Sequence, residues 1–133
     1  MANEWVKVEL YGANNDGNPI RFTVPNNVDI SQGTLMQLVD PFTASGAVTQ
    51  GAAIAGVASM DKIANDGSTS ISVWTDGRFL AVASAAITVG GEIAMGVLQN
   101  QVWAGVGGSG AFTCGHALET AATGDTFNVR LKL

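Results

Sequence analysis

Short runs of alternating apolar and polar residues, separated by turn-forming residues, are the main pattern in this chain. The stretch 56–79, GVASMDKIANDGSTSISVWTDGRF, contains three such runs, which are interrupted at Asn65-Asp66-Gly67 and at Asp76-Gly77. An Asp-Gly pair readily takes the positive φ angles of a tight hairpin turn. The pattern therefore predicts a strand, a loop, a strand, a tight turn and a third strand.

The chain contains a second stretch of the same kind. Residues 114–131, CGHALETAATGDTFNVRL, keep the order of glycine, alanine, charged loop, glycine turn and alternating strand. Upstream of each stretch, DISQGTLMQL at 29–38 resembles AITVGGEIAM at 86–95. The order indicates either two copies of one β unit or a chance likeness between short strand-turn-strand segments.

The N-terminal region predicts two strands, at 5–11 and 20–24, joined by a loop rich in turn formers. In the first strand, Trp5, Lys7, Glu9 and Tyr11 alternate with Val6, Val8 and Leu10. The two segments together suggest an N-terminal hairpin. Further strands are expected at 34–39, 52–59, 78–83, 112–119 and 125–133, with a weakly signalled helix at 60–65 and loops at 42–51 and 105–110. Residues 86–95 are read as a glycine turn followed by a strand, and 97–104 as a segment with a hairpin turn at Gln99-Asn100.

The composition supports an all-β protein. Of 133 residues, 17 are glycine and only 13% are charged, while 47% are hydrophobic. Low charge with abundant glycine and small β-forming residues is typical of many short strands and turns. We therefore expect residues 1–133 to form one domain, a small β-barrel or β-sandwich with little helix, built from two similar units.

The charge pattern argues against two classes of partner. The net charge is −5, and Arg21, Arg78 and Arg130 are scattered rather than clustered, so nucleic-acid binding is not expected. No stretch approaches the about 20 apolar residues of a membrane span, and MANEWVKVEL has no signal-peptide core. We expect a chain made in the cytoplasm, with no membrane partner.

Residues that carry chemistry are sparse. His116 is the only histidine and Cys114 the only cysteine, and we expect Cys114 to be a buried apolar residue. Asp61, Asp66 and Asp76 read as turn and loop residues rather than as metal ligands. No enzyme activity, metal or cofactor is expected. A small enzyme that uses His116 with a nearby acid is the third-ranked reading.

Three tryptophans, Trp5, Trp74 and Trp103, permit two interpretations. Exposed in a row, they would form a sugar-binding platform. Buried or at subunit contacts, they would be structural, which is the more common use of aromatic residues.

Four motifs in order carry a resemblance to a known family. They are DISQGTLMQLVDPFTAS, IAGVASMDKIANDGSTSISVWTDGRF, ITVGGEIAMG and GHALETAATGDTFNVRLKL, and they extend over residues 25–133. This sequence resembles the capsid cement, or head decoration, proteins of tailed bacteriophages and related viruses. The resemblance implies a structural protein on the outer face of an icosahedral head, commonly a homotrimer near three-fold axes that clamps neighbouring major capsid proteins.

Residues 1–24 match that family less well, so we expect them to form an N-terminal strand or hairpin that acts as a docking arm, with 25–133 as the decoration domain. The expected contacts with the capsid or a neighbouring subunit come from this strand and from one later aromatic residue: Trp5, Val6, Val8, Leu10, Tyr11 and Trp103. A plain edge strand within the domain is the other reading of the same segment. The alternative function is a carbohydrate-binding or adhesive β-module on a virion or cell surface.

Overall fold

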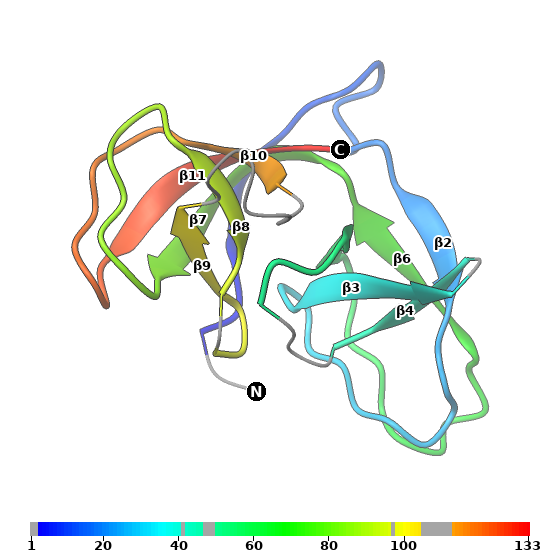
Figure 1. Ribbon diagram of the computed structural model, residues 1–133. Helices are drawn as coiled ribbons and strands as arrows, with labels where there is room; N and C mark the ends of the chain where they lie inside the picture. Colours follow the sequence, from blue (N-terminus) through cyan, green and yellow to red (C-terminus); the bar gives the residue numbers. More distant parts are fainter. Residues whose placement is uncertain (1–2, 41, 47–49, 97, 105–112) are drawn as a thin grey trace.

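The computed structural model of the chain describes residues 3–40, 42–46, 50–96, 98–104 and 113–133, and this part of the chain contains strands and no helix (Figure 1). The strands are β1 (Val6–Leu10), β2 (Ile20–Thr23), β3 (Leu35–Asp40), β4 (Thr43–Ser45), β5 (Ile54–Ala58), β6 (Ser70–Trp74), β7 (Asp76–Ala83), β8 (Glu92–Met95), β9 (Gln101–Ala104), β10 (Thr113–Ala117) and β11 (Thr126–Lys132). Strands β2 to β6 close into a first barrel and β7 to β11 into a second. The expected all-β fold is confirmed.

The two barrels repeat one topology. In the first, β2 pairs in parallel with β4 and antiparallel with β6, and β5 pairs with β3 and β6. In the second, β7 pairs in parallel with β9 and antiparallel with β11, and β10 pairs with β8 and β11. Even the isolated bridges correspond, since Ile30 meets Lys62 in one unit and Ile87 meets Ala121 in the other. The prediction of two similar β units is confirmed.

Each barrel encloses an apolar core, but the second core extends further. The first contains buried Met36, Ile71 and Val73. The second contains Phe79 and Phe127 and also takes in residues of the first barrel's outer wall and the N-terminal segment, namely Trp5, Leu35, Ile54, Val57 and Trp74. One end of the second barrel therefore packs against the side of the first (Figure 1).

Asn100, in the β8–β9 connection, forms the polar part of this junction. Its side chain accepts a hydrogen bond from the backbone N–H of Leu35 at 2.8 Å, and its backbone oxygen accepts one from the indole N–H of Trp5 at 3.0 Å. Asn100 has a φ of 63°, which asparagine tolerates better than most residues. The expected turn at Gln99-Asn100 is confirmed.

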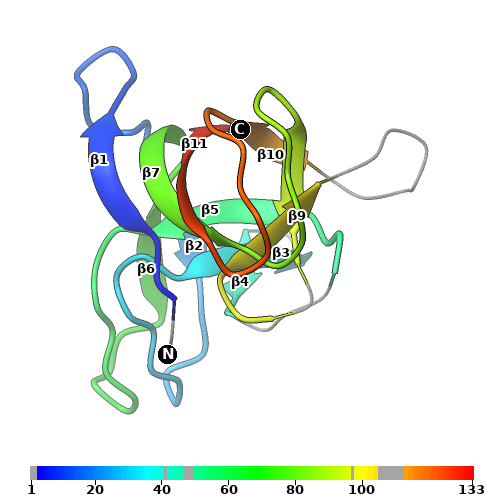
Figure 2. The ribbon, with the colours of Figure 1, turned by 90° about the vertical axis from the view of Figure 1, so that its left-hand side faces the viewer.

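Strand β1 adds to the second barrel as an edge strand. It pairs antiparallel with β7, and a register shift between Lys7 and Glu9 leaves Val8 as an extra residue. Figure 2 shows β1 beside β7, with no strand on its other side. The predicted N-terminal hairpin is therefore wrong, because β1 pairs with β7 whereas β2 pairs with β6 and β4.

The prediction of a tight turn at Asp76-Gly77 is also wrong. These two residues begin β7, which pairs with β1 and β11 and not with β6. Gly77 serves close packing instead, since a Cβ there would lie 2.8 Å from the backbone oxygen of Glu9 on β1. The helix expected at 60–65 does not form, because Lys62 makes a β-bridge there.

Strand β4 lies inside the segment read as a loop at 42–51, because its three small or polar residues give no alternation to detect. The buried strand expected at 52–59 is confirmed by β5, whose five residues are all buried. The loop expected at 105–110 lies outside the described residues.

Candidate functional site

Val6 and Val8 are the exposed apolar residues of the edge strand β1, with 56% and 41% of their surface accessible. Leu10, on the same strand, instead packs against the core of the second barrel. The extra residue at Val8 explains why the three do not share one surface, because a bulge reverses the alternation of side chains. Unpaired edges with exposed apolar side chains are where a further strand can add.

Trp5 and Tyr11 flank β1 and both have contacts within the chain. Trp5 is buried, and its ring centroid lies 5.7 Å from that of Phe79. The guanidinium of Arg130 lies over the ring of Tyr11, 4.5 Å from the centroid of that ring. A hydrogen bond with Glu9 raises the pKa of Tyr11. Trp5 is thus placed in the core, although the sequence suggested it for an outer contact.

The three tryptophans do not form an exposed row. Trp5 and Trp74 are buried, and Trp103 is half-buried, with a buried indole N–H that has no hydrogen-bond partner among the described residues. Trp74 forms part of a groove beside β1, where the ammonium of Lys7 lies 5.8 Å from its ring centroid. This arrangement is structural and gives no flat aromatic platform for a sugar ring.

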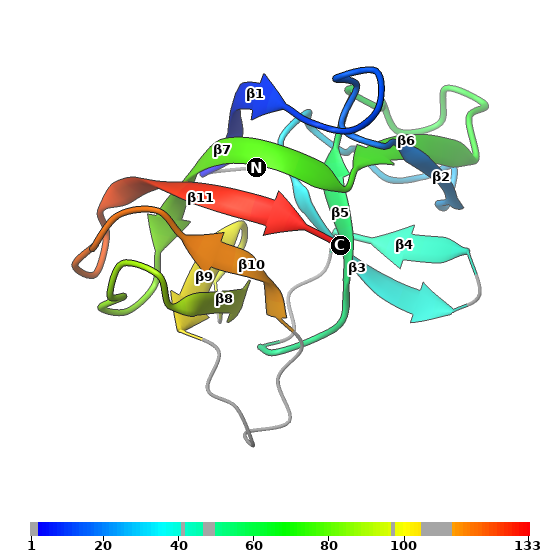
Figure 3. The ribbon, with the colours of Figure 1, turned by 90° about the horizontal axis from the view of Figure 1, so that it is seen from above.

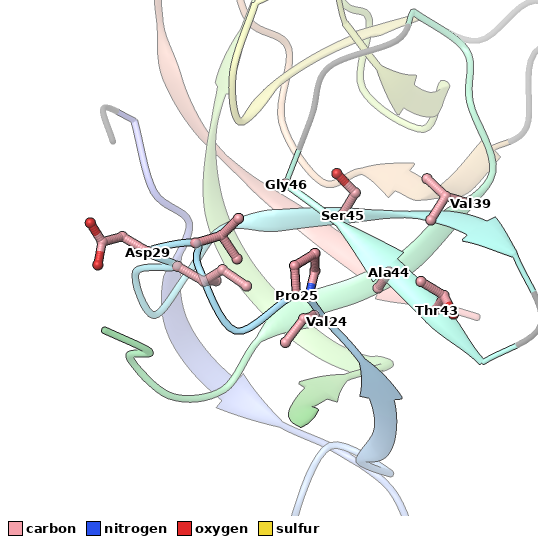
Figure 4. A pocket seen from close by; sticks show the side chains of 10 residues that line it. Val24, Pro25, Asp29, Val39, Thr43, Ala44, Ser45 and Gly46 are labelled. Carbon is pink, nitrogen blue, oxygen red and sulfur yellow. The ribbon is translucent and has the colours of Figure 1, made fainter. Parts of the chain in front are cut away.

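A cavity of about 460 Å³ opens beside β4 in the first barrel. Figure 4 shows Val24, Val39 and Ala44 around it, while the carboxylate of Asp29 points away. Asp29 accepts a hydrogen bond from the backbone N–H of Ala64 at 2.6 Å, so it already has a structural role. The described residues that line the cavity are mostly apolar and bring no group of polar side chains together, so the cavity suits apolar atoms.

Next to this cavity, the β3–β4 hairpin carries exposed apolar residues that the sequence analysis did not select. Leu38, Val39 and Phe42 are 40%, 50% and 71% exposed. One sequence signal was available, because Phe42 is an aromatic residue directly after the Asp40-Pro41 stop and within a stretch of small polar residues. Such a residue contributes nothing obvious to a turn.

His116 lies exposed on β10, where its register neighbours are Glu92 on β8 and Arg130 on β11. It lines neither the cavity beside β4 nor the groove beside β1. Within the described ranges there is no group of three or more His, Cys, Asp or Glu side chains that could hold a metal ion. In the same part of the chain, no helix is long and apolar enough to span a membrane.

Lys62 is buried, yet its ammonium is satisfied within the first barrel. It donates to the backbone oxygens of Asn26 and Val28 at 2.8 and 3.2 Å and lies 3.5 Å from the carboxylate of Asp66. The backbone N–H of Ser68, followed by the charge of Lys62, lowers the pKa of Asp66. Because a buried charge is tolerated when it is paired and hydrogen-bonded, Lys62 is a structural group that ties the loops together.

Cys114 is a buried free thiol, and burial raises its pKa to about 12. Because the thiolate is the reactive form, we expect no reaction with a thiol reagent such as DTNB in the native protein near pH 8. Full reaction is expected once urea unfolds the chain, which provides the positive control. Rapid labelling of the folded protein would contradict the buried placement.

The chain was compared with known proteins. The family model described as phage cement protein matches residues 14–133. Among solved structures, the head fiber gp8.5 N base of bacteriophage phi29 has a similar fold, with a TM-score of 0.57 at 17% identity, over 86% of this chain and 94% of that one. No curated protein matches the sequence. The chain belongs to the phage cement protein family, and it is thus a structural protein associated with the phage capsid.

Proposed function

We propose that this protein binds the outer surface of an icosahedral phage head and stabilises the shell by bridging neighbouring major capsid proteins. The family match over residues 14–133 is the observation that carries this proposal. Each bound copy contributes a modest free energy, and the many copies on a shell make the total large. The protein acts as a homotrimer at three-fold or quasi-three-fold positions, and no catalytic role is part of the proposal.

Strand β1, within residues 1–24, serves as a docking arm. Strand β2 also lies in that range, but it is one strand of the closed first barrel, so it belongs with 25–133 to the decoration domain. Two observations support a separate role for β1. Strand β1 lies at the edge of the sheet with Val6 and Val8 exposed, and it precedes residue 14, where the family match begins. An added strand would gain main-chain hydrogen bonds along β1 and side-chain contacts with the two valines. Its source is the major capsid protein or an adjacent subunit.

The test is co-sedimentation of the purified protein with heads that lack it. We expect saturable binding at a fixed ratio to the major capsid protein, three copies for each three-fold site, and longer survival of the decorated heads under heat or chelator. Light scattering gives the mass of the free protein. Absence of binding to every head preparation would overturn the proposal and favour the glycan-binding alternative.

If β1 is a docking arm, charged side chains on this edge strand should weaken head binding. The double substitution Val6→Lys with Val8→Lys places two lysines on β1, where lysine discourages strand addition. We expect head binding to weaken by about tenfold, which corresponds to about 1.4 kcal/mol. Both side chains are largely exposed, so the melting temperature should change little.

A matched control adds the same charge nearby but off the strand. Ala13→Lys with Asn14→Lys changes two exposed residues of the loop after β1. Equal weakening by both pairs would indicate a general charge effect and would remove the support for strand addition.

A further inference from the structure

The two barrels share a register, so their residues can be compared position by position. Ile20 pairs with Val73 as Phe79 pairs with Val129, and Leu38 pairs with Ala44 as Met95 pairs with Val102. Phe42 directly precedes β4 as Asn100 directly precedes β9. At one end of the barrels this gives three equivalent pairs: Ile20 with Phe79, Leu38 with Met95, and Phe42 with Asn100.

These equivalent positions differ sharply in exposure. In the second barrel, Phe79, Met95 and Asn100 are 0%, 2% and 2% exposed. In the first barrel, the corresponding residues are 43%, 40% and 71% exposed. We call Ile20, Leu38 and Phe42 the open end of the first barrel. It is apolar, and two of its residues, Leu38 and Phe42, belong to the β3–β4 hairpin, which points away from the second barrel in Figure 3, while Ile20 begins β2.

The end of the second barrel is buried because the first barrel covers it. The covering surface consists of Leu35, Val57 and Trp74 on the outer wall of β3, β5 and β6, together with Trp5. The end of the second barrel is thus packed against aliphatic and aromatic side chains of the same molecule. The open end of the first barrel has the same kind of surface, and none of the described residues covers it in this way.

A second copy of the chain does not supply that cover through the same contact. The register equates Leu35, Val57 and Trp74 of the first wall with Glu92, His116 and Arg130 of the second. A wall with those polar and charged side chains would have to lose its hydration against an apolar end, which is unfavourable. The repeat therefore does not continue from one chain to the next, and the open end suits a different partner.

The backbone at Phe42 gives an independent reason to assign a role to this end. Phe42 has a φ of 48°, whereas the equivalent Asn100 has 63°. Positive φ is uncommon outside glycine, and for a bulky residue it is a real outlier, whereas asparagine accepts it. The phenylalanine is held there by the hydrogen bond from the N–H of Thr23 to its oxygen, at 2.6 Å, and by its contact with Phe22. Strain of this kind persists at functional positions.

We propose that the open end is a docking surface for the major capsid protein, and that its occupant is a capsid segment with aliphatic and aromatic side chains. The chemistry of this occupant follows from the junction between the barrels, where side chains of the same kind cover the end of the second barrel. The cavity beside β4 lies next to this end, since Val39 and Thr43, the chain neighbours of Leu38 and Phe42, line it. The inference rests on the proposed function and adds a second contact, distinct from the docking arm.

The substitution Phe42→Asn tests the docking surface, because it places at the open end the residue that the second barrel already has. We expect head binding to weaken by about tenfold or more, as for a central aromatic anchor. The melting temperature should stay equal or rise, since asparagine suits the positive φ. A loss of binding without a loss of stability is the signature of a docking residue.

A second variant and a control make the result independent of one residue. Ile20→Thr, which keeps a β-branched residue on β2, should also weaken head binding. Ile63→Asn is the control, because Ile63 is 70% exposed in the β5–β6 loop, at the barrel end where Gly33 bonds to Ala58, opposite to the hairpin. It should bind heads as the wild type does.

The outcomes separate the two proposals. If the wild type binds no heads, the proposed function fails. If the wild type binds and both Phe42→Asn and Ile20→Thr bind equally well, the function stands and the docking surface is wrong. If light scattering shows that Phe42→Asn abolishes self-association while isolated chains still bind heads normally, a second copy is the occupant and this inference is overturned.

Discussion

Replacing Gly115 by alanine will destabilise the folded protein by about 3 kcal/mol, a cost typical of forcing extra atoms into a well-packed site. A Cβ at Gly115 would collide with the backbone oxygen of Arg130 on the neighbouring strand. The obstacle is backbone rather than the end of a flexible side chain, so β10 and β11 would have to separate. Gly56, the equivalent residue of the first barrel, meets the backbone oxygen of Trp74 in the same way.

Gly124→Ala is the matched control for Gly115→Ala. Gly124 has a φ of 87°, but nothing lies within 4 Å of a Cβ there. Its alanine substitution should therefore cost only the backbone strain of a positive φ, about 1 kcal/mol. Urea unfolding followed by tryptophan fluorescence gives both values. Equal losses at the two positions would show that φ rather than the collision decides the cost.

The repeat itself was readable from the sequence because backbone geometry places glycines at equivalent positions. Gly56 and Gly115 allow close strand approach, and Gly33 and Gly90 both have positive φ ahead of β3 and β8. Alternation likewise revealed the strands with one buried side, such as β11, where Phe127 and Val129 are buried. These features are local, so a single sequence contains them.

Strand pairing could not be read in the same way. The sequence places β1 next to β2, but β1 pairs with β7, about seventy residues later in the chain. The Asp76-Gly77 signal was misleading because the glycine is needed for the approach of Glu9 and not for a turn. Long-range contacts of this kind override local turn preference.

For the candidate contact residues of β1, too, the sequence showed the local pattern but not the long-range packing. Alternation in β1 distinguishes two faces but does not say which one is covered, so Trp5 and Val6 looked equally available. The pairing of Val6 with Leu80 and the packing of Trp5 against Phe79 decide that Val6 is exposed and Trp5 buried. Phe42 was missed because exposure at a barrel end depends on the neighbouring barrel, which sequence periodicity does not describe.

Trp5→Ala will destabilise the protein by about 4 kcal/mol, the usual cost of deleting a buried aromatic side chain. Trp5 is 3% exposed, packs against Phe79 and donates its indole N–H to Asn100 at the junction of the two barrels. Val6→Ala, one residue away on β1 and 56% exposed, should cost far less and serves as the control. Thermal and urea unfolding measure both.

This prediction also determines how the docking arm can be tested. Deleting residues 1–11 would remove Trp5 together with the exposed valines, so a loss of head binding would not separate docking from folding. Trp5→Ala, assayed at a temperature where it is folded, should bind heads as the wild type does, while the lysine pair at Val6 and Val8 should not. If Trp5→Ala instead kept full stability and lost head binding, Trp5 would be an outer contact and its place in the core would be wrong.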